Sequence, residues 1–540
     1  NNAFGQRDSG RGARSGPPIF CLLTESCLFW KMEESSHGSD GSNRNNGDSK
    51  RDYDEEISYS SGEPAPKRLK KTDKETLGDR LSALPDSLLL HILSLLPMKE
   101  VVQTSTLSKK WQHLWTCVDN LTFIYDDLWS NRFEKFISFV NKTLILCSCS
   151  KITKFAVRFD YDICLDSDVD SWIRFASKNK VEDLNLNFVG LQSFHGKDSY
   201  SLPQHLYSNS SLTKLKLSLC VLEPSGVISW GSLKNLSLRY VVLSEDVIER
   251  ILSGCPLLEV LELCDFCGLR RLDVTSSPNV RTLKLKGLLG SDDDWLEISA
   301  PNLLSLEISG NLYKKCRLVK VSSLVDANLS FALYTLTDDY EEHRNMLLKL
   351  LESLGHVKEL TIGNWCTQVL SILDVKGLPS PLLKCKCLTL DTHMENWDLP
   401  GIANLLQSSP SLETLVIDMP SDYTTRCHFS TEFGDTYIFN GEDYLTSQKR
   451  NFVCLSQHLK NVKIVDFGKR HSIFELKLVQ FLLEKARVLE KMVIKSEWKR
   501  GDQYFGFECC MSQELLKLAQ QLLSFPRSSP TAIVVFSESC

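Results

Sequence analysis

A short arrangement of apolar positions recurs along most of the chain from about residue 180 onward. In each copy an apolar residue is followed by two variable residues, a second apolar residue, one variable residue and a third apolar residue. Because the last two apolar positions are two residues apart, each copy predicts a short β-strand with its apolar side chains on one side. The copies are Leu212–Leu217, Leu233–Leu238, Leu258–Leu263, Val280–Leu285, Leu303–Ile308, Val357–Ile362, Leu412–Ile417, Leu459–Ile464 and Leu489–Ile494, with a shorter one at Leu388–Leu390.

Helical segments are predicted between these strands. A helix is expected to open at Ser244 and to end near Gly254 and Pro256, and another is expected from about Glu341 to Leu354. No single strand–helix unit can bury its apolar face alone. The units are therefore expected to stack with their strands parallel, so that stacking provides the core.

The clear copies lie about 21 to 30 residues apart, which is the period of leucine-rich repeats. We therefore expect an α/β fold in which an irregular leucine-rich-repeat solenoid covers residues 180–445, with parallel strands on the concave face and helices or loops outside. Irregular spacing near residues 310–355 and 418–455 predicts insertions. The alternative, a doubly wound sheet, would show long crossover helices and a glycine-rich phosphate loop, and neither pattern is evident.

Residues 79–115 follow a helical pattern instead. Pro85 suits the first position of a helix, and Pro97 ends the run. Between the two prolines, these apolar residues recur at helical spacing: Leu88, Ile92, Leu95 and Leu96.

Two more short helices are expected after this one. The second covers Lys99 to Leu107, and Ser108 caps the third. The third helix is expected to carry on one face Trp111, Leu114 and Trp115. Three short helices cannot bury so many apolar side chains by themselves, so the outward-facing excess predicts a partner protein. The alternative is a small helical cap that covers the first repeat.

The order of residues in this segment resembles the plant F-box across residues 79–125. The matching motifs are Leu84-Pro85-Asp86-x-Leu88, Ile92-Leu93-Ser94-x-Leu96-Pro97 and Thr104-Ser105-x-Leu107-Ser108-Lys109-x-Trp111-x-x-Leu114-Trp115. The resemblance implies that apolar anchors dock into a groove of a Skp-like adaptor, and through it onto a cullin complex. The family's adaptor contacts correspond to Leu84, Pro85, Leu88, Ile92, Leu93, Leu96 and Pro97, with Leu107 and Trp111 as additions.

The end of the chain carries a second resemblance. Residues 450–497 read as a strand, an amphipathic helix and a strand, and they resemble the plant FBD domain. Such a segment can form one more solenoid turn, with residues 498–540 as a C-terminal cap. A separate partner surface is the alternative. With residues 126–179 as a linking helical and strand segment, the whole arrangement is similar to plant F-box/FBD/leucine-rich-repeat proteins.

The N-terminal region has no such pattern. Residues 1–31 precede the first methionine and are expected to be an upstream leader or a gene-model artefact. Residues 32–76 contain few large apolar side chains, so they cannot offset the entropy lost on ordering and are expected to be disordered. Two basic groups in this segment predict nuclear import, with a solvated linker as the alternative. They comprise Lys50, Arg51, Lys67, Arg68, Lys70 and Lys71. The expected location is the nucleus, the cytoplasm or both, with the nucleus favoured.

Charge and hydropathy narrow the possible partners. The net charge of -6 gives no general attraction to nucleic acid or to an anionic membrane. No stretch reaches the roughly 18 apolar residues that a membrane helix requires. The expected partners are therefore proteins, and neither nucleic acid nor a membrane is expected.

The sequence lacks the motifs of catalytic sites. It contains no phosphate loop, no glycine-x-serine-x-glycine elbow, no zincin motif and no paired CxxC. Cys264-x-x-Cys267 stands alone and Cys385-x-Cys387 straddles a repeat strand, whereas structural zinc needs four ligands. The other cysteines are scattered through apolar segments, which is typical of buried reduced thiols. We therefore expect no enzymatic activity, no metal, no cofactor and no buried polar cluster that could hold a ligand.

The side chains that flank the apolar positions of the repeat strands are expected to face the concave surface and to contact a substrate. Basic residues prevail in the earlier copies and acidic residues in the later ones, which predicts a gradient of charge. Ordinary solvated charge is the alternative. The candidates are Lys214, Lys216, Arg239, Lys284 and Lys286, then Glu307, Glu359, Asp391 and Asp418, with Glu262 as an early exception.

The F-box resemblance implies the substrate-recognition subunit of an SCF-type ubiquitin ligase. In that role the repeats bind a protein substrate for ubiquitination, and the chain raises the effective concentration of the target lysine near the charged enzyme. Two alternatives remain open. One is a ligand-dependent F-box receptor, and the other is a non-catalytic nuclear scaffold of leucine-rich repeats.

Overall fold

The computed structural model describes residues 81–125, 133–189, 199–289, 295–312, 315–333, 340–419, 444–447, 449–468, 473–496 and 508–538. They fall into two compact units. The first, called the hook, contains the described residues up to Leu93 together with Lys99–Trp115. The second, called the solenoid, contains Ser94–Met98 and the described residues from Thr116 onward. The predicted basic import cluster and the predicted disordered segment lie outside the described residues.

The hook region is built from two short helices and turns. Helix α2 covers Asp86–Leu93, and α3 covers Met98–Thr104. Both predicted helices are present but shorter than expected, because residues 94–96 form a turn after α2 and residues 105–107 form a turn after α3. The expected third helix was wrong: residues 109–113 form turns and lead into a single 3-10 turn, η1 (Leu114–Cys117). Hydrogen bonds from this segment to residues near α2, described below, hold it in that form.

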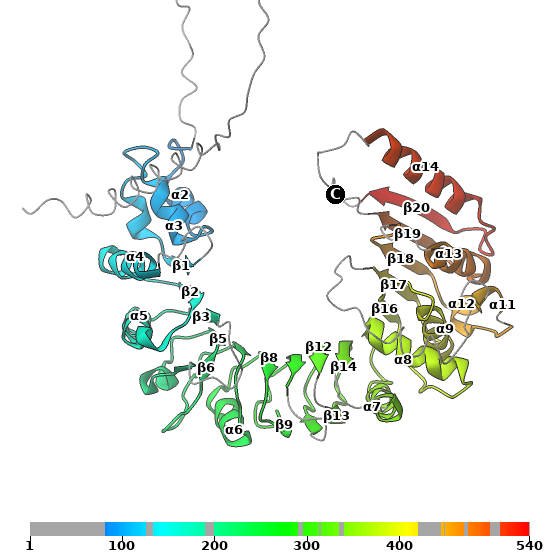
Figure 1. Cartoon of the computed structure of the whole chain (residues 1–540), viewed down its shortest axis with the longest axis horizontal. Coiled ribbons are helices and arrows are strands. Elements are labelled where there is room, and N and C mark those ends of the chain that lie inside the picture. The colour runs from blue at the N-terminus through cyan, green and yellow to red at the C-terminus, as the bar shows by residue number, and fades with distance from the viewer. Residues whose placement is uncertain are drawn as a thin grey trace, which may run out of the picture. The chain divides into compact units, whose positions relative to one another are not determined.

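One sheet of fifteen parallel strands, in chain order, organises the solenoid, as Figure 1 shows. Its strands are β1 (Asn120–Ile124), β2 (Lys154–Asp160), β3 (Asp183–Val189), β5 (Lys214–Ser218), β7 (Asn235–Arg239), β8 (Val260–Phe266), β10 (Thr282–Leu288), β12 (Ser305–Leu312), β14 (Asp326–Leu333), β15 (Glu359–Ile362), β16 (Cys387–Asp391), β17 (Thr414–Asp418), β18 (Asn461–Val465), β19 (Lys491–Ser496) and β20 (Ile533–Glu538). Every repeat copy predicted from the sequence lies on one of these strands, so the expected α/β solenoid is confirmed.

The sheet contains strands that the leucine pattern did not reveal. β1 and β2 pair in parallel before residue 180, so the described residues of the expected linking segment belong to the solenoid. β14 lies in the region of irregular spacing. Its buried positions are Ala327, Leu329 and Phe331, and the alanine replaces the leucine by which the other copies were recognised.

Helices cover most of the outer side of the sheet (Figure 1). They are α4 (Phe133–Leu146), α5 (Asp166–Lys178), α6 (Glu245–Gly254), α7 (Tyr340–Ser353), α8 (Asn364–Val375), α9 (Asp398–Ser408), α12 (Val453–Gln457), α13 (Ile473–Lys485) and α14 (Glu508–Ser524), with shorter turns at η3 (Ile163–Leu165), η4 (Gln204–Ser208) and α11 (Tyr444–Ser447). The two predicted returns are confirmed as α6 and α7. The side chain of Ser244 caps α6 by accepting a hydrogen bond from the backbone amide of Val247 at 3.3 Å.

In the middle of the solenoid the returns are strands rather than the expected helices. β9 (Arg271–Asp273), β11 (Trp295–Ser299) and β13 (Lys315–Lys320) form a second parallel sheet. In β11 the buried Leu296 and Ile298 alternate with Glu297, which is the period of a strand. A two-stranded pair, β4 (Tyr200–Ser201) and β6 (Cys220–Val221), lies earlier in the chain.

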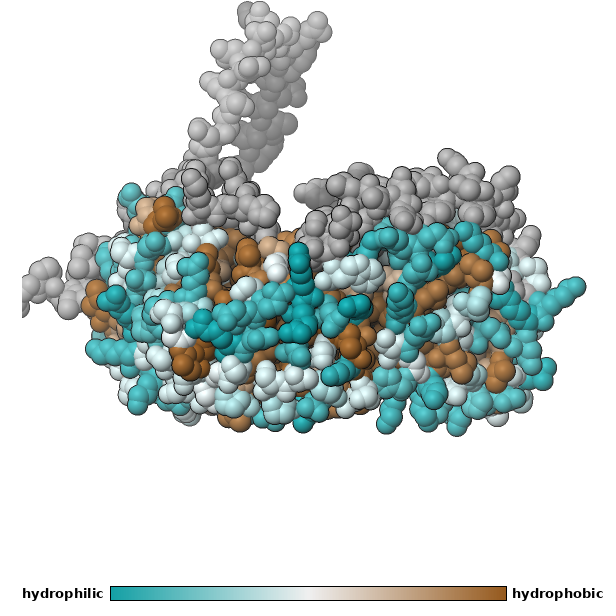
Figure 2. Space-filling model, turned by 90° about the horizontal axis from the view of Figure 1, so that it is seen from below, coloured by the Kyte–Doolittle hydropathy of each residue, from teal (hydrophilic) through white to brown (hydrophobic). Residues whose placement is uncertain are grey.

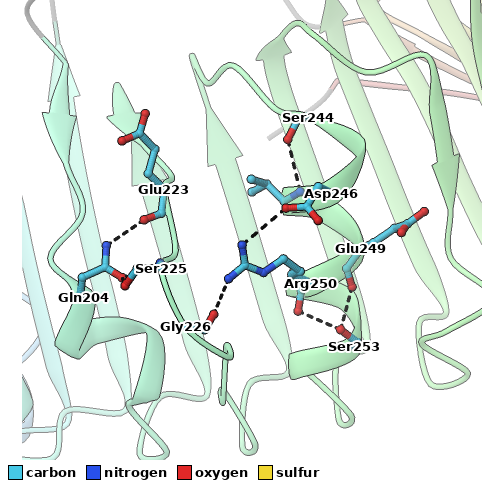
Figure 3. Close-up of polar contacts among 10 residues, drawn as sticks. Gln204, Glu223, Ser225, Gly226, Ser244, Asp246, Glu249, Arg250 and Ser253 are labelled. Atoms are coloured by element: carbon cyan, nitrogen blue, oxygen red, sulfur yellow. Dashed lines mark hydrogen bonds and ion pairs between the residues drawn. The ribbon is translucent and has the colours of Figure 1, made fainter.

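Polar contacts tie neighbouring returns together, as Figure 3 shows for α6 and the segments before it. The Arg250 guanidinium pairs with Asp246 at 3.5 Å and donates to the carbonyl oxygen of Gly226. On the face of the molecule seen in Figure 2, hydrophobic residues appear as separate areas between hydrophilic ones. Such scattered apolar residues are normal on a soluble surface and do not by themselves indicate a partner.

The tail continues the same architecture. β18, α13 and β19 form the expected strand, helix and strand, and β18 pairs in parallel with β17. β20 then pairs with β19. The assignment of residues 450–497 as a separate FBD domain stays a prediction.

Candidate functional site

Two apolar stripes run along α2 of the hook. Leu89 and Leu93 are four residues apart and fully buried. Leu88 and Ile92 form the neighbouring stripe, and their side chains are 49% and 39% exposed. One stripe therefore anchors the helix, and the other is left exposed on the surface of the hook.

The remaining predicted adaptor contacts divide in the same way. Pro85 and Leu107 are exposed and Leu84 is half-buried, and the nearby Leu81, which is not one of the predicted contacts, is 56% exposed. Trp111 is almost fully buried, and its indole nitrogen donates to the hydroxyl of Ser82 at 2.9 Å. Leu93 and Trp111 thus lie in the interior of the fold, and their assignment as adaptor contacts stays a prediction.

Two further predicted contacts lie in a segment that belongs to the solenoid unit. Leu96 and Pro97 are half-buried there, and the neighbouring Leu95 is 72% exposed. Leu95 was recognised from its helical spacing but was not included among the contacts, because the family motif leaves its position variable.

Lys110 positions the segment that precedes α2. Its ammonium donates to the carbonyl oxygens of Ser82 at 2.9 Å and Leu84 at 2.6 Å, and it pairs with Asp86 at 3.2 Å. These bonds fix the start of the exposed stripe and explain why residues 109–113 are turns. The sequence reasoning missed Lys110, which lies at a variable position between Lys109 and Trp111.

The inner face of the solenoid carries the predicted charged residues on neighbouring strands. Lys214 and Lys216 are exposed on β5, and Glu359 is exposed on β15. The side chains between them are largely paired, so the simple basic-to-acidic gradient was wrong in the middle of the sheet. Arg239, for example, pairs with Asp265 at 3.4 Å.

A ladder of ion pairs crosses β8, β10 and β12. Lys286 lies 3.7 Å from Glu262 and 3.3 Å from Glu307, and Lys284 lies 3.6 Å from Glu307. Desolvation opposes the charge of Lys286, but the carboxylates of Glu307 and Glu262 outweigh it, so the pKa of Lys286 is raised. These lysines neutralise their neighbours and are not an open basic surface.

The acidic end of the face is different. Asp391 on β16 and Asp418 on β17 are paired in register. Burial, and then the Asp418 carboxylate, raises the pKa of Asp391. Two carboxylates side by side are an unfavourable arrangement, which a positively charged group would relieve.

A small cavity of about 80 Å³ lies at the rim of this acidic end. It is called the rim pocket here. It is lined by residues at the ends of β12, β14 and β16 and at the start of α8: Gly310, Asn311, Ser330, Phe331, Ala332, Gly363, Asn364, Trp365, Asp391 and His393.

A buried polar layer lies between α8 and α9, which the sequence patterns did not predict. Asp398 is fully buried and accepts hydrogen bonds from the Thr392 hydroxyl and the Glu395 amide, both at 2.8 Å, and from the Gln368 side chain at 3.2 Å. Desolvation raises the pKa of Asp398 to about 6, although these bonds oppose it. Its contacts link three segments of the chain, which makes it a structural carboxylate.

Close packing of α8 on α9 explains this layer. A Cβ on Gly401 would lie 2.1 Å from the backbone oxygen of Thr367, so only glycine fits. The Ser371 hydroxyl accepts from the Gly401 amide at 2.7 Å and donates to the Trp397 carbonyl. The hydroxyl thereby bridges the Gly401 amide and the Trp397 carbonyl, a donor and an acceptor near the N-terminus of α9.

The strap formed by α11 and the residues after it is fixed to α8. Arg450 makes two contacts with the almost buried Asp374, at 2.5 and 2.9 Å. The Tyr444 hydroxyl donates to the same carboxylate. This bidentate pairing satisfies a buried charge and is structural.

Seven of the described cysteines are buried in the core, whereas Cys117 and Cys164 are exposed. Burial raises the pKa of Cys255, Cys316 and Cys454 to about 12, so these thiols stay protonated. Among the described residues, no group of three or more histidine, cysteine or acidic side chains could hold a metal ion. In that part of the chain no helix is both long and apolar enough to cross a membrane.

A helical hook with an exposed leucine stripe, followed by a parallel leucine-rich-repeat solenoid, defines an F-box protein with leucine-rich repeats. An F-box domain model matches residues 81–122, and a model described as "At1g61320/AtMIF1, LRR domain" matches residues 145–525. The chain belongs to the F-box/LRR-repeat family.

Relatives in Arabidopsis thaliana support this assignment. F-box/LRR-repeat protein At3g03360 is 36% identical over 480 residues, which cover 85% of this chain and 91% of that protein. Putative F-box/LRR-repeat protein At3g18150 is 32% identical over 436 residues, covering 80% and 88%. F-box/LRR-repeat protein At5g02910 is 35% identical over 363 residues, covering 66% and 74%.

Proposed function

We propose that this chain is the substrate-recognition subunit of an SCF-type ubiquitin ligase. The hook docks a Skp-like adaptor, and through it a cullin complex, while the inner face of the solenoid holds a protein substrate. The supporting observation is the exposed stripe of Leu88 and Ile92, which lies beside a buried stripe of the same residue types on one helix. The chain contributes proximity rather than catalysis.

Substituting charged residues into the exposed stripe of α2 tests whether the hook docks onto the adaptor. The full chain is co-expressed with a Skp-type adaptor and a cullin, and both are quantified after purification of the chain. Leu88→Glu combined with Ile92→Glu should weaken the affinity for the adaptor by about a thousandfold and so remove adaptor and cullin from the purified complex, because two apolar anchors of about 2 kcal/mol each are lost. Val227→Glu is the matched control, since Val227 is 87% exposed in the solenoid. Equal recovery of the double variant and the wild type would refute the proposal.

The substrate is proposed to meet the exposed part of the inner face. Lys214 and Lys216 are the open basic residues of the predicted set, whereas Lys284 and Lys286 are paired with Glu262 and Glu307. Ubiquitin conjugates that accumulate under proteasome inhibition are compared between the wild type and a Lys214→Glu, Lys216→Glu variant. Loss of specific conjugates with unchanged adaptor recovery is expected. Unchanged conjugates would remove these lysines from the substrate surface.

The two alternative functions, a ligand-dependent receptor and a scaffold without ubiquitination, predict different properties. A ligand-dependent receptor needs a pocket of roughly 300–1,000 Å³ for a drug-sized molecule, and the rim pocket measures about 80 Å³. A scaffold without ubiquitination would purify without a cullin. The co-expression experiment above therefore separates the scaffold from the ligase subunit.

We further propose that the chain enters the nucleus through its basic cluster and that residues 450–497 form an FBD segment near the C-terminal end of the solenoid. A fluorescent fusion tests the first point. Replacing Lys67, Arg68, Lys70 and Lys71 with alanine should move the fusion from the nucleus to the cytoplasm. A fusion that stays nuclear would refute import through this cluster.

A further inference from the structure

The rim pocket exists because neighbouring strands differ in length. β14 has 8 residues, whereas β15 has 4. β14 therefore continues past the end of β15 through Phe331 and Ala332, while the chain after β15 turns at Gly363 directly into α8. Gly363 allows this turn to press against β14, since an added Cβ would lie 2.7 Å from the Cα of Ser330. Because β14 extends beyond β15, a cavity remains next to the extended end of β14.

Aromatic rings and a carboxylate share the lining. The rings of Phe331 and Trp365 lie with their centroids 5.5 Å apart, and both side chains are held almost fully buried. Asp391 is the acidic residue of the lining, and none of the lining residues is lysine or arginine. Aromatic faces attract cations, and a carboxylate forms its strongest hydrogen bonds with charged donors.

The charges around the pocket act in the same direction. Asp418 lies in register beside Asp391, on the neighbouring strand β17. Burial and the Asp418 carboxylate disfavour the ionised form of Asp391. Within the described residues no cation pairs with the Asp391 side chain. A cation supplied by a bound molecule would therefore gain from the Asp391 carboxylate.

One feature acts in the opposite direction. The N-terminus of α8 lies at the pocket, and its cap residue Gly363 provides no side-chain hydrogen bond. A helix N-terminus is equivalent to roughly half a positive charge and favours an anion. Ionised Asp391 brings a full negative charge to the lining of the pocket. This carboxylate outweighs the helix, so the favoured occupant is a cation.

The size of the cavity limits what that cation can be. At about 80 Å³ it has room for the end of one side chain but not for a drug-sized molecule. We propose that the rim pocket binds one basic side chain, arginine or lysine, of the polypeptide held on the inner face of the solenoid. The description of that polypeptide as a ubiquitination substrate rests on the proposed function, whereas the chemistry of the pocket does not.

Four capped tripeptides test the proposal on the full chain purified with its adaptor. They carry arginine, lysine, citrulline or glutamate between two glycines, and citrulline is the neutral counterpart of arginine. Binding is measured by ligand-observed NMR. The arginine or lysine peptide should bind at least about tenfold more tightly than the citrulline and glutamate peptides, since tenfold corresponds to one modest charged contact. The stronger of the two basic peptides identifies the preferred side chain.

Two variants of the chain locate the binding. Asp391→Asn should remove the preference for the basic peptide, and Ala332→Leu should weaken all four peptides by filling the cavity. Glu359→Gln is the matched control, because it removes a charge from the same face without lining the pocket. A basic preference that survives Asp391→Asn, a preference for glutamate, or no binding by any peptide would overturn the proposal.

Adaptor recovery is measured on the same samples and reports on the hook alone. Lost adaptor recovery with an intact basic preference would refute the ligase function and leave the pocket standing. Intact recovery with no basic preference would refute the pocket alone.

Discussion

The hook and the solenoid use leucines in opposite ways. In α2 the pairs Leu88–Leu89 and Ile92–Leu93 are adjacent in sequence, so they form two stripes roughly 100° apart around the helix and only one can be buried. In a repeat strand such as β5, leucines alternate with lysines, so every leucine enters the core and every lysine stays outside. The first surface is apolar, and the second is charged. One chain thus carries two binding surfaces with different chemistry.

The largest expected effect tests the division of α2 into two stripes. Leu93→Ala should destabilise the region by about 2–5 kcal/mol, because it empties a fully buried site. Leu88→Ala should change stability by less than about 0.5 kcal/mol, yet it should weaken adaptor binding. Hydrogen exchange of the α2 amides measures the first effect, and adaptor titration the second. Similar exchange in the two variants would show that the stripes are equivalent.

The buried polar layer predicts a second effect on stability. Asp398→Ala should cost about 3 kcal/mol, because three buried donors lose their acceptor. Asp398→Asn should be tolerated at pH 7. The Asn oxygen can accept from Thr392 and Glu395, and a rotated Gln368 amide can turn its unbonded oxygen toward the new NH₂ group. Urea unfolding of both variants measures the difference.

The pH dependence of the same carboxyl follows from its raised pKa. The stability contributed by protonated Asp398 is complete below its ordinary pKa of 3.8 and is lost as the pH rises through about 6. Between pH 7 and pH 5, the wild type should therefore gain about 1.4 kcal/mol relative to Asp398→Asn. Paired unfolding curves at the two pH values measure this gain. A constant difference between the two proteins would show that Asp398 keeps an ordinary pKa.

The contact between α8 and α9 should tolerate no added atom. Gly401→Ala should cost about 1–3 kcal/mol, because the new methyl group overlaps the Thr367 carbonyl. Gly231→Ala is the control, since an added Cβ there meets nothing within 4 Å. Thermal unfolding of the two variants measures the contrast. Equal melting temperatures would mean that the helices can move apart without cost.

The smallest effect concerns the ladder on the inner face. Lys286→Gln should cost about 0.5 kcal/mol, because cross-strand ion pairs near a surface are weak. The cost should fall in 1 M salt, since screening weakens such pairs. Lys216→Gln should be neutral at either salt concentration. Urea unfolding at low and high salt tests both statements, and a Lys286 effect independent of salt would exclude an electrostatic origin.

Local patterns predicted the elements of this protein well. The alternation of apolar residues identified the repeat strands, and Pro85 and Ser244 indicated the starts of α2 and α6. β14 was missed because Ala327 replaces the expected leucine, and the outer strands β9, β11 and β13 were missed because three to six alternating residues carry little signal. The third helix of the hook was wrong because bonds from Lys110 and Trp111 to distant residues override local preference.

The sequence by itself determined the two-part architecture, since helical and strand periods are local properties that a reader can count along the chain. Only the tertiary structure decided which stripe of α2 is buried and which inner-face lysines are neutralised by neighbouring strands. It also decided that Asp391 meets Asp418 at a rim where β14 outruns β15. Each of these outcomes depends on pairs of residues far apart in the chain, and the spacing of residue types along one strand or helix does not contain that information.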